Sequence, residues 1–168
     1  MIYTIKSEYH GISDLKKLLG EHPEIQFVSF MGVDIGGNGT DEKIPIKLFI
    51  KDMEDMLRYG IQTDGSSVEL QGIADLNDAR VDILPDLDCN WFVDYNYEYL
   101  SDENGLPVGT LKIPSFIIHS EKQVCSRSIL KRATNNFKVQ LLEILKVNPG
   151  ICEGCGFRYT DVEEVLLT

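Results

Sequence analysis

Apolar and polar side chains alternate from Val93 to Tyr99, and from Ser126 onward the apolar residues recur at steps of three and four. Strict alternation is typical of a strand with one solvated face, whereas steps of three and four are typical of a helix with one apolar side. The sequence therefore predicts a strand over residues 91–100 and a long helix from Ser126 that ends at Pro149-Gly150. The expected apolar stripe of this helix consists of Leu130, Ala133, Phe137, Leu141 and Ile144.

Turn residues connect the predicted strand to a partner. Asn104 and Gly105 tolerate a positive φ angle and are typical of a hairpin turn. Residues 106–119 are then expected to return as the antiparallel partner strand. Upstream of this hairpin, residues 80–86, with the sequence RVDILPD, are expected to form a short strand that Pro85 closes.

The first fifty residues predict a helix followed by a hairpin. Ser13 is the expected N-cap of the helix and Gly20 is its expected end. Residues 25–31, IQFVSFM, form an apolar run short enough for a buried strand. A glycine-rich turn then leads to a second run, KIPIKLFI, which we expect to be the second strand of the hairpin, at an edge because of Pro45.

Asp52 is the expected N-cap of a second helix, which carries Met53, Met56 and Leu57 on its apolar side and ends at Gly60. Strands and helices do not alternate along the chain as they do in a doubly wound sheet. The order instead predicts the α+β class, in which a small mixed sheet packs on one or two helices and a long helix follows.

Charge and composition limit the function. The 168 residues carry 16 Lys and Arg against 27 Asp and Glu, a net charge of −11. Such a surface repels phosphate backbones and anionic lipids, so we expect neither nucleic acid nor a membrane as a partner. The sequence shows no export signal and no apolar run of about 18 residues. We therefore expect a cytoplasmic protein whose four cysteines are reduced.

The segment DGSS, residues 64–67, is the first candidate site. Aspartate and serine favour turns because they bond to nearby backbone, and Gly65 permits a positive φ angle, so local preferences favour a plain turn. The functional alternative is that Asp64 holds a cation or accepts a proton, while Ser66 and Ser67 offer hydroxyl groups. The residue types alone leave both interpretations open.

Two further motifs favour interpretations other than a functional site, incidental cysteines in one case and a flexible connection in the other. Cys152 and Cys155 form a lone Cys-x-x-Cys pair, short of the roughly four ligands that a structural zinc site needs. The glycine-rich residues 34–40, DIGGNGT, lack the lysine of a phosphate-binding loop and predict a flexible hairpin connection.

Tyrosines and aspartates also form short rows. A stacking platform for single-stranded nucleic acid is opposed by the net charge, so we expect the tyrosines to lie on a covered sheet face. The aspartates lack the spacing of a calcium loop and predict a solvated face, so we expect no metal site. These rows are Tyr95, Tyr97 and Tyr99, and Asp75, Asp78, Asp82, Asp86 and Asp88.

Several segments, taken in order, resemble the N-terminal part of glutamine synthetase. They are FMGVDIGGNGTDEKIPIKLF, MEDMLRYGIQTDGSSVELQGI and NDARVDILPD, followed by SRSILKRATNNF, which is similar to the first helix of that family's catalytic domain. The resemblance covers about residues 27–137. It implies a β-grasp domain over residues 1–120 and the start of a catalytic domain over residues 121–168.

The resemblance implies a role for the DGSS segment. Asp64 would bind ammonium and take its proton, Ser67 would be a supporting polar residue, and the ammonia would attack γ-glutamyl phosphate. The small domain would supply this loop to the active site of a neighbouring subunit in a homo-oligomeric ring. The substrates would be ammonium, glutamate and ATP, with Mg or Mn as the metal.

The resemblance also implies that much of the active site belongs to later residues. The metal-ligating glutamates, the nucleotide-contacting segment and the arginines for glutamate all follow in that family, and Glu163 and Glu164 do not match the metal position. We therefore expect a fragment of a glutamine synthetase that binds no cofactor and is inactive by itself. The alternatives are a stand-alone β-grasp interaction module and a related ligase that joins ammonia or an amine to another acid.

Overall fold

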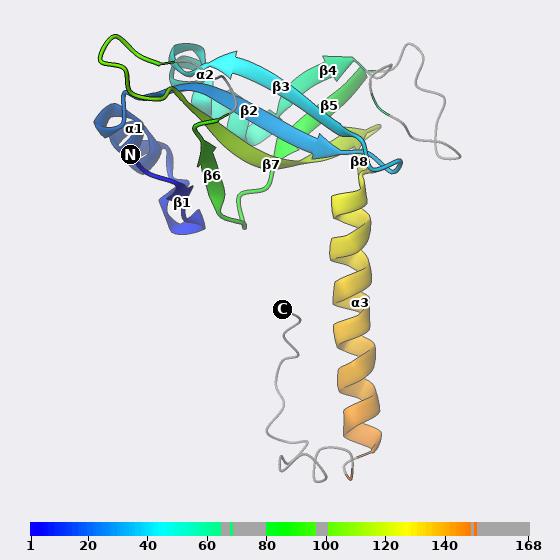
Figure 1. The fold of residues 1–168 in the computed structure, drawn as a ribbon. Coiled ribbons are helices and arrows are strands. Elements are labelled where there is room, and N and C mark those ends of the chain that lie inside the picture. Colours follow the sequence, from blue (N-terminus) through cyan, green and yellow to red (C-terminus); the bar gives the residue numbers. More distant parts are fainter. Residues whose placement is uncertain (65–67, 69–79, 97–100, 149, 151–168) are drawn as a thin grey trace. The chain divides into compact units, whose positions relative to one another are not determined.

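The computed structural model describes residues 1–64, 68, 80–96, 101–148 and 150 (Figure 1). Contacts within the chain divide it into two compact units, Met1–Ser126 and Arg127–Thr168. The strands and the first two helices belong to the first unit, and the long helix α3 (Ser126–Val147) begins at the boundary.

The described strands of the first unit form a mixed sheet, in which β2 lies beside β3 and β7 (Figure 1). β4 pairs with β5, β5 pairs with β7, and β8 also pairs with β7. The central path of the sheet runs in the order β1 (Thr4–Ile5), β6 (Trp91–Asp94), β7 (Gly109–His119), β2 (Ile25–Val33) and β3 (Gly39–Pro45). The strands off this path are β4 (Ile61–Asp64), β5 (Arg80–Pro85) and β8 (Lys122–Gln123).

Strand β7 is long enough to pair twice. Its first half, up to Pro114, runs parallel to β2, and within that half it also pairs antiparallel with β6. From Ser115 to Ile118 it pairs antiparallel with β5 instead. The change of partner comes directly after Pro114, which has no backbone N–H to donate to a neighbouring strand.

The main core lies where the two helices of the first unit meet the sheet. The helices are α1 (Ile12–Glu21) and α2 (Ile46–Tyr59). Their buried residues recur at steps of four, which places them on one side of each helix. Burial of each large apolar side chain contributes about 1.5–3 kcal/mol. The core residues include Leu15, Leu19, Phe49, Met53 and Leu57 from the helices and Val28, Phe30, Trp91, Leu111 and Ile113 from the sheet.

A second apolar cluster lies around the later half of β7. Its buried members come from β5, from β7, from the residues after β8 and from the isolated described residue Val68. They are Val68, Val81, Phe116, Ile117, Val124 and Cys125. The predicted α+β class, with a mixed sheet packed on helices, is confirmed.

The predicted start and end of the first helix are wrong. α1 begins after Gly11 rather than at Ser13, and Gly20 lies within it. The strand predicted over residues 25–31 is confirmed as β2, and the edge position predicted for its partner is confirmed by β3 at the end of the sheet order.

The run KIPIKLFI, predicted to be one strand, belongs to two elements. β3 ends at Pro45, and α2 begins at Ile46. Proline suits this boundary because its fixed φ angle fits the residue that precedes a helix, and the helix does not need its N–H group. Asp52, the predicted N-cap, instead lies inside α2 at a kink with φ −109° and ψ 22°. Gly60 ends the helix as predicted.

The later strands agree better with the sequence. β5 ends at Pro85 as predicted, and the predicted return strand is β7. β6 covers Trp91–Asp94, so it stops before the described Tyr95, while Tyr97 and Tyr99 lie outside the described residues.

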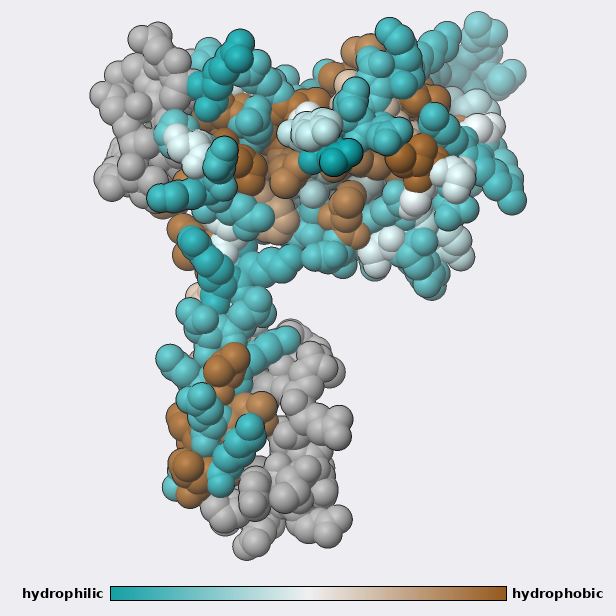
Figure 2. Space-filling model, turned by 180° about the vertical axis from the view of Figure 1, so that it is seen from behind, coloured by the Kyte–Doolittle hydropathy of each residue, from teal (hydrophilic) through white to brown (hydrophobic). Residues whose placement is uncertain are grey.

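Helix α3 is 22 residues long, about 33 Å, and confirms the predicted helix. Part of its predicted stripe is exposed, since Leu130, Phe137 and Ile144 are each at least half accessible, and apolar residues are visible along the helix in Figure 2. Across the described ranges, no helix combines the length and the apolar character needed to cross a membrane.

Candidate functional site

Strand β4 begins at a position that requires glycine. Gly60 has a φ angle of +76° with ψ −168°, a region that residues with a side chain rarely adopt. A Cβ atom on Gly60 would lie 2.5 Å from the Ile83 carbonyl oxygen of β5. The glycine therefore lets α2 end against the sheet and lets β4 pair at once with β5, with Ile61 opposite Ile83.

Asp64 is the last residue of β4, and its side chain is exposed. It pairs across the strands with Arg80, the first residue of β5, while the preceding residue Thr63 is buried. Alternation along the strand explains why one side chain points inward and the next outward. The connection over residues 65–79 therefore starts and finishes at the same end of the β4–β5 pair.

A hydrogen bond from the edge strand fixes the residue before Asp64. The Thr63 hydroxyl donates to Oε1 of Glu42 on β3 at 2.5 Å. A hydroxyl that donates to a carboxylate forms a short, strong bond, and Thr63 is only 7% exposed. The contact ties the end of β4 to β3, 21 residues away in sequence, and so positions the backbone that carries Asp64.

Val68 fixes the chain on the other side of the DGSS motif. Its side chain is buried in the second apolar cluster, beside residues of β5 and β7. Ser67, the second residue predicted for the ammonium site, lies outside the described residues, as do Gly65 and Ser66. The motif is thus bounded by a paired strand on one side and by a core residue on the other.

The exposed face of the β4–β5 pair carries the charged side chains that lie next to the DGSS motif on these two strands. Asp64 shares it with Gln62 of β4 and with Arg80 and Asp82 of β5. An exposed carboxylate can bind a small cation through charge-assisted hydrogen bonds and can accept a proton from it. In the part of the chain that the structure describes, no group of three or more His, Cys, Asp or Glu side chains could hold a metal ion.

A polar cluster that we did not predict lies on neighbouring strands, with Ser29 and Lys112 buried and Asp41 exposed. The Ser29 hydroxyl of β2 donates to Oδ2 of Asp41 on β3 at 2.7 Å, and Nζ of Lys112 on β7 donates to the Ser29 hydroxyl oxygen at 3.3 Å. Burial, followed by the charge of Lys112, lowers the pKa of the adjacent Lys43, while Asp41 acts in the opposite direction. Polar residues inside the apolar runs of β2 and β7 were the signal that could have revealed this cluster.

The glycine-rich connection between β2 and β3 is a turn closed by Asp34. This carboxylate is 1% exposed and accepts hydrogen bonds from the backbone and the side chain of Asn38. The hydroxyl of Ser126 donates to the Asp34 carbonyl. These bonds organise the hairpin, and the position of the motif between β2 and β3 confirms the predicted hairpin connection.

The solvated face predicted for the aspartates is wrong for Asp86. This residue is 4% exposed, and its carbonyl accepts a hydrogen bond from the Trp91 indole at 3.0 Å. Asp82 and Asp88 are exposed as predicted. The remaining predicted positions lie outside the described residues: Asp75, Asp78, Cys152, Cys155, Glu163 and Glu164.

Tyr95 is a buried structural residue. Its hydroxyl donates to the Ile2 carbonyl at 2.8 Å and accepts from the Ile2 amide at 3.1 Å, and burial raises the pKa of the phenol. This agrees with the covered position that we predicted for the tyrosine row.

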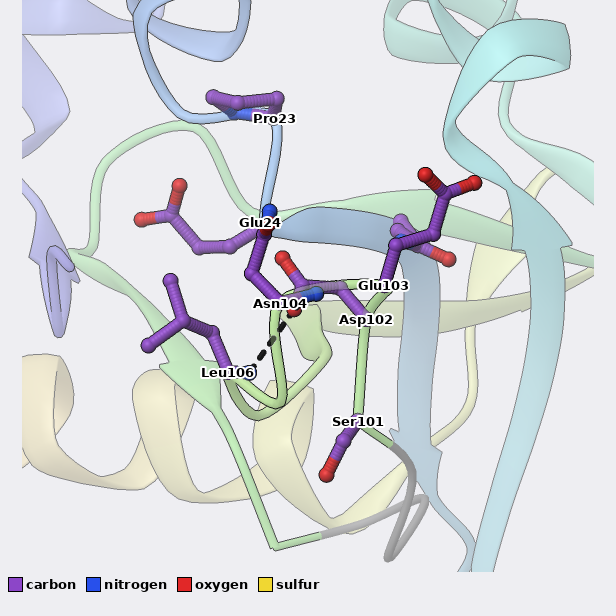
Figure 3. A pocket seen from close by; sticks show the side chains of 8 residues that line it. Pro23, Glu24, Ser101, Asp102, Glu103, Asn104 and Leu106 are labelled. Carbon is purple, nitrogen blue, oxygen red and sulfur yellow. Dashed lines mark hydrogen bonds between the residues drawn. The ribbon is translucent and has the colours of Figure 1, made fainter.

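Figure 3 shows a separate pocket of about 610 Å³ between the segment that enters β2 and the turn around Asn104. Glu24, Asp102 and Glu103 contribute carboxylates to its lining. The Asp102 carboxylate accepts hydrogen bonds from the amides of Asn104 and Leu106, and Glu24 pairs with His22 at 2.9 Å. Burial raises the pKa of the Glu24 carboxyl, but its hydrogen bonds and the charge of His22 lower this pKa by more, so the net shift is downward. Asp102 and Glu24 are thus committed to local structure.

No family model and no curated protein matches the sequence. Among solved structures, the chain is similar to ligand-free GmaS, a gamma-glutamylmethylamide synthetase, with 16% identity and a TM-score of 0.45, over 66% of this chain and 22% of that one. It is also similar to a GmaS/ADP complex, with 16% identity and a TM-score of 0.49, over 73% of this chain and 26% of that one. The chain spans about a quarter of the length of these structures, and similarity at this level does not assign it to a family.

Proposed function

We propose that this chain is the N-terminal part of a glutamine synthetase-like, ATP-dependent ligase, and that Asp64 binds ammonium and takes its proton. The order of motifs in the sequence supports the proposal. The observation that carries it is the exposed Asp64 carboxylate at the end of β4, directly before the motif, on a strand braced by the Thr63–Glu42 hydrogen bond.

The chemistry required of Asp64 is modest. A carboxylate stabilises ammonium through charge-assisted hydrogen bonds and then accepts a proton as the ammonia is used as a nucleophile. The hydroxyl of Ser67 would supply a further acceptor for an N–H group. ATP, glutamate and Mg or Mn would be held by residues other than those described in this chain, and a neighbouring subunit of a ring would complete the site.

The proposal is tested by measuring ATP-dependent amide formation from glutamate with the product of the complete reading frame. We expect activity with ammonium or with a small amine such as methylamine, and we expect Asp64→Ala to reduce it about 100-fold or more, the range for loss of a catalytic base. Asp64→Asn is the matched variant, since it keeps the size of the side chain and removes the proton acceptor. A monomeric product without ligase activity would instead support the interaction module.

The same substitution should leave the isolated chain folded. An exposed carboxylate at the end of a strand contributes little, so Asp64→Ala should change the free energy of unfolding by less than about 0.5 kcal/mol. Urea denaturation followed by circular dichroism measures this change. A large loss of stability would show that Asp64 is a structural residue of the turn.

A further inference from the structure

His10 occupies a buried position between the N-terminal segment, residues 1–9, and the turn that joins β5 to β6, residues 86–90. The residue follows β1 and the short 3₁₀ helix η1 (Ser7–Tyr9), and it is 8% exposed. Its ring stacks on the indole of Trp91, with centroids 3.7 Å apart and an angle of 19° between the planes. Nδ1 lies 3.0 Å from the carbonyl oxygen of Leu87 in that turn.

This geometry defines which ring nitrogen carries the hydrogen in the neutral imidazole. A carbonyl oxygen can only accept, so Nδ1 must carry the hydrogen and donate it to Leu87. In the neutral ring Nε2 then has a lone pair, and this atom is buried without a hydrogen-bond partner in the described part of the chain. A second proton would place a positive charge on a buried ring.

The groups around the ring act in opposite directions. Burial is the largest effect and lowers the pKa of His10, whereas the backbone carbonyls of Leu87 and Ile5 and the carboxylate of Asp86 raise it, and the net shift is downward. Asp86 belongs to the β5–β6 turn and is held there by a bond from its amide to the Pro114 carbonyl at 2.8 Å. Of the other charged groups on these two segments, the amino group of Met1 pairs with Glu24 at 3.5 Å, and the side chains of Lys6, Glu8 and Asp88 are exposed.

We propose that His10 is a pH-sensitive contact between the N-terminal segment and the β5–β6 turn. Its neutral form attaches the segment to the turn, and its protonation weakens that attachment. Other contacts also hold the segment: Ile5 is buried in the main core, and the amide and carbonyl of Ile2 bond to the Tyr95 hydroxyl. β1 pairs with β6 over two residues, Thr4 and Ile5. The amide of Val93 donates to the Tyr3 carbonyl at 2.9 Å, and the amide of Ser7 donates to the side chain of Asn90 at 3.2 Å.

The direction of the effect follows from the lowered pKa. Above the ordinary imidazole pKa of 6.5, His10 is neutral in both the closed and the released segment, so pH has no influence. As the pH falls below that value, the released form binds a proton and the closed form does not, which favours release. The opening constant should rise by up to about tenfold for each unit by which burial lowers the pKa.

The experiment is NMR on the intact chain from about pH 7.5 to about pH 5.5, a range that spans the ordinary pKa. The ring protons of His10 report its titration, and amide hydrogen exchange of Ser7 and Val93, corrected for the intrinsic rate at each pH, reports opening of the segment. We expect His10 to titrate below 6.5 and these two amides to lose protection relative to amides of β2 and β7. The fluorescence of Trp91, the one tryptophan of the sequence, should change in parallel because release removes the imidazole ring that stacks on its indole.

Two variants remove the proton site in different ways. His10→Gln keeps a donor for Leu87, and His10→Phe keeps the ring against Trp91, and both should abolish the pH dependence of opening. His119→Gln, at the distant β7–β8 turn, is the matched control and should retain it. The proposal is overturned if His10 titrates at or above 6.5, or if either His10 variant opens with the same pH dependence as the wild type. The titration of the wild-type ring decides the matter if neither variant folds.

Discussion

At the scale of single residues, glycine has opposite effects at two positions of the first unit. Gly60 adopts a backbone conformation that disfavours a side chain and lies against the Ile83 carbonyl, whereas Gly20 lies inside α1 with open space around its Cα. In the first position the absence of a Cβ atom is required. In the second it only adds backbone entropy to the unfolded chain.

We predict that substitution by alanine destabilises the protein at Gly60 and stabilises it at Gly20. Gly60→Ala should lower the free energy of unfolding by about 1–3 kcal/mol, because of the strained φ and ψ angles, with a further loss from the contact with Ile83. Gly20→Ala should raise it by about 0.5–1 kcal/mol, the difference in helix propensity. Urea denaturation of both variants checks the pair. Similar losses at both sites would contradict the assignment of strain to Gly60.

The candidate site illustrates what residue patterns reveal at this scale. Asp64 was identified from the order of neighbouring motifs, and its position after the glycine-ended helix α2 is as expected. Glu42 was not identified, because its partner Thr63 lies 21 residues away and no local pattern links the two. The burial of Asp86 was missed for the same reason, since it depends on Trp91 and β7 rather than on its own neighbours.

At the scale of elements, the turn between β7 and β8 contains unfavourable residues. Ser120 and Glu121 have φ angles of +48° and +64°, and they connect the paired residues His119 and Lys122. Tight two-residue turns with positive φ at both positions favour Asn-Gly, because these residues tolerate the left-handed region. A side chain in that region costs about 1–2 kcal/mol relative to glycine.

We predict that the double substitution Ser120→Asn and Glu121→Gly raises the free energy of unfolding by about 1 kcal/mol. Gly105→Ala is the reverse experiment at another turn, because Gly105 has φ +76° with open space around it and should lose a similar amount. Thermal denaturation of the two proteins provides the measurement. No change in either would mean that both turns relax without strain.

The boundary between β3 and α2 shows why element types are harder to predict than their existence. The run from Lys43 to Ile50 is apolar enough for either a strand or a helix, and periodicity cannot separate them over so few residues. The evidence for a helix lay further on, in Phe49, Met53 and Leu57, which recur at steps of four and all enter the core. Longer patterns, such as α3, were predicted well because several turns agree.

At the scale of the whole molecule, both apolar clusters consist of residues from the first unit. The second cluster includes Val124 and Cys125, which follow β8. The domain boundary after residue 120 that the resemblance implies stays a prediction. What the two parts do in a larger enzyme stays a prediction.

We predict that a chain ending at Ser126 keeps a melting temperature within a few degrees of that of the full sequence, while a chain ending at Ser120 does not. The shorter chain loses β8, Val124 and Cys125, and burial of one valine-sized side chain contributes about 1.5–3 kcal/mol. That loss corresponds to roughly 5 °C or more in a domain of this size. Scanning calorimetry of the two fragments checks it, and equal melting temperatures would show that the second cluster contributes little.

The double pairing of β7 has a consequence for how the protein is made. This strand stands at the centre of the sheet, yet it is the last long strand of the first unit in the sequence. During synthesis, α1, α2 and the β2–β3 hairpin leave the ribosome with the β7-facing edge of β2 unpaired, and unpaired edges bind other chains. The central strand of the sheet is therefore added late in synthesis, and we expect slow translation before residue 109 to prolong the interval in which the edge of β2 can pair with another chain.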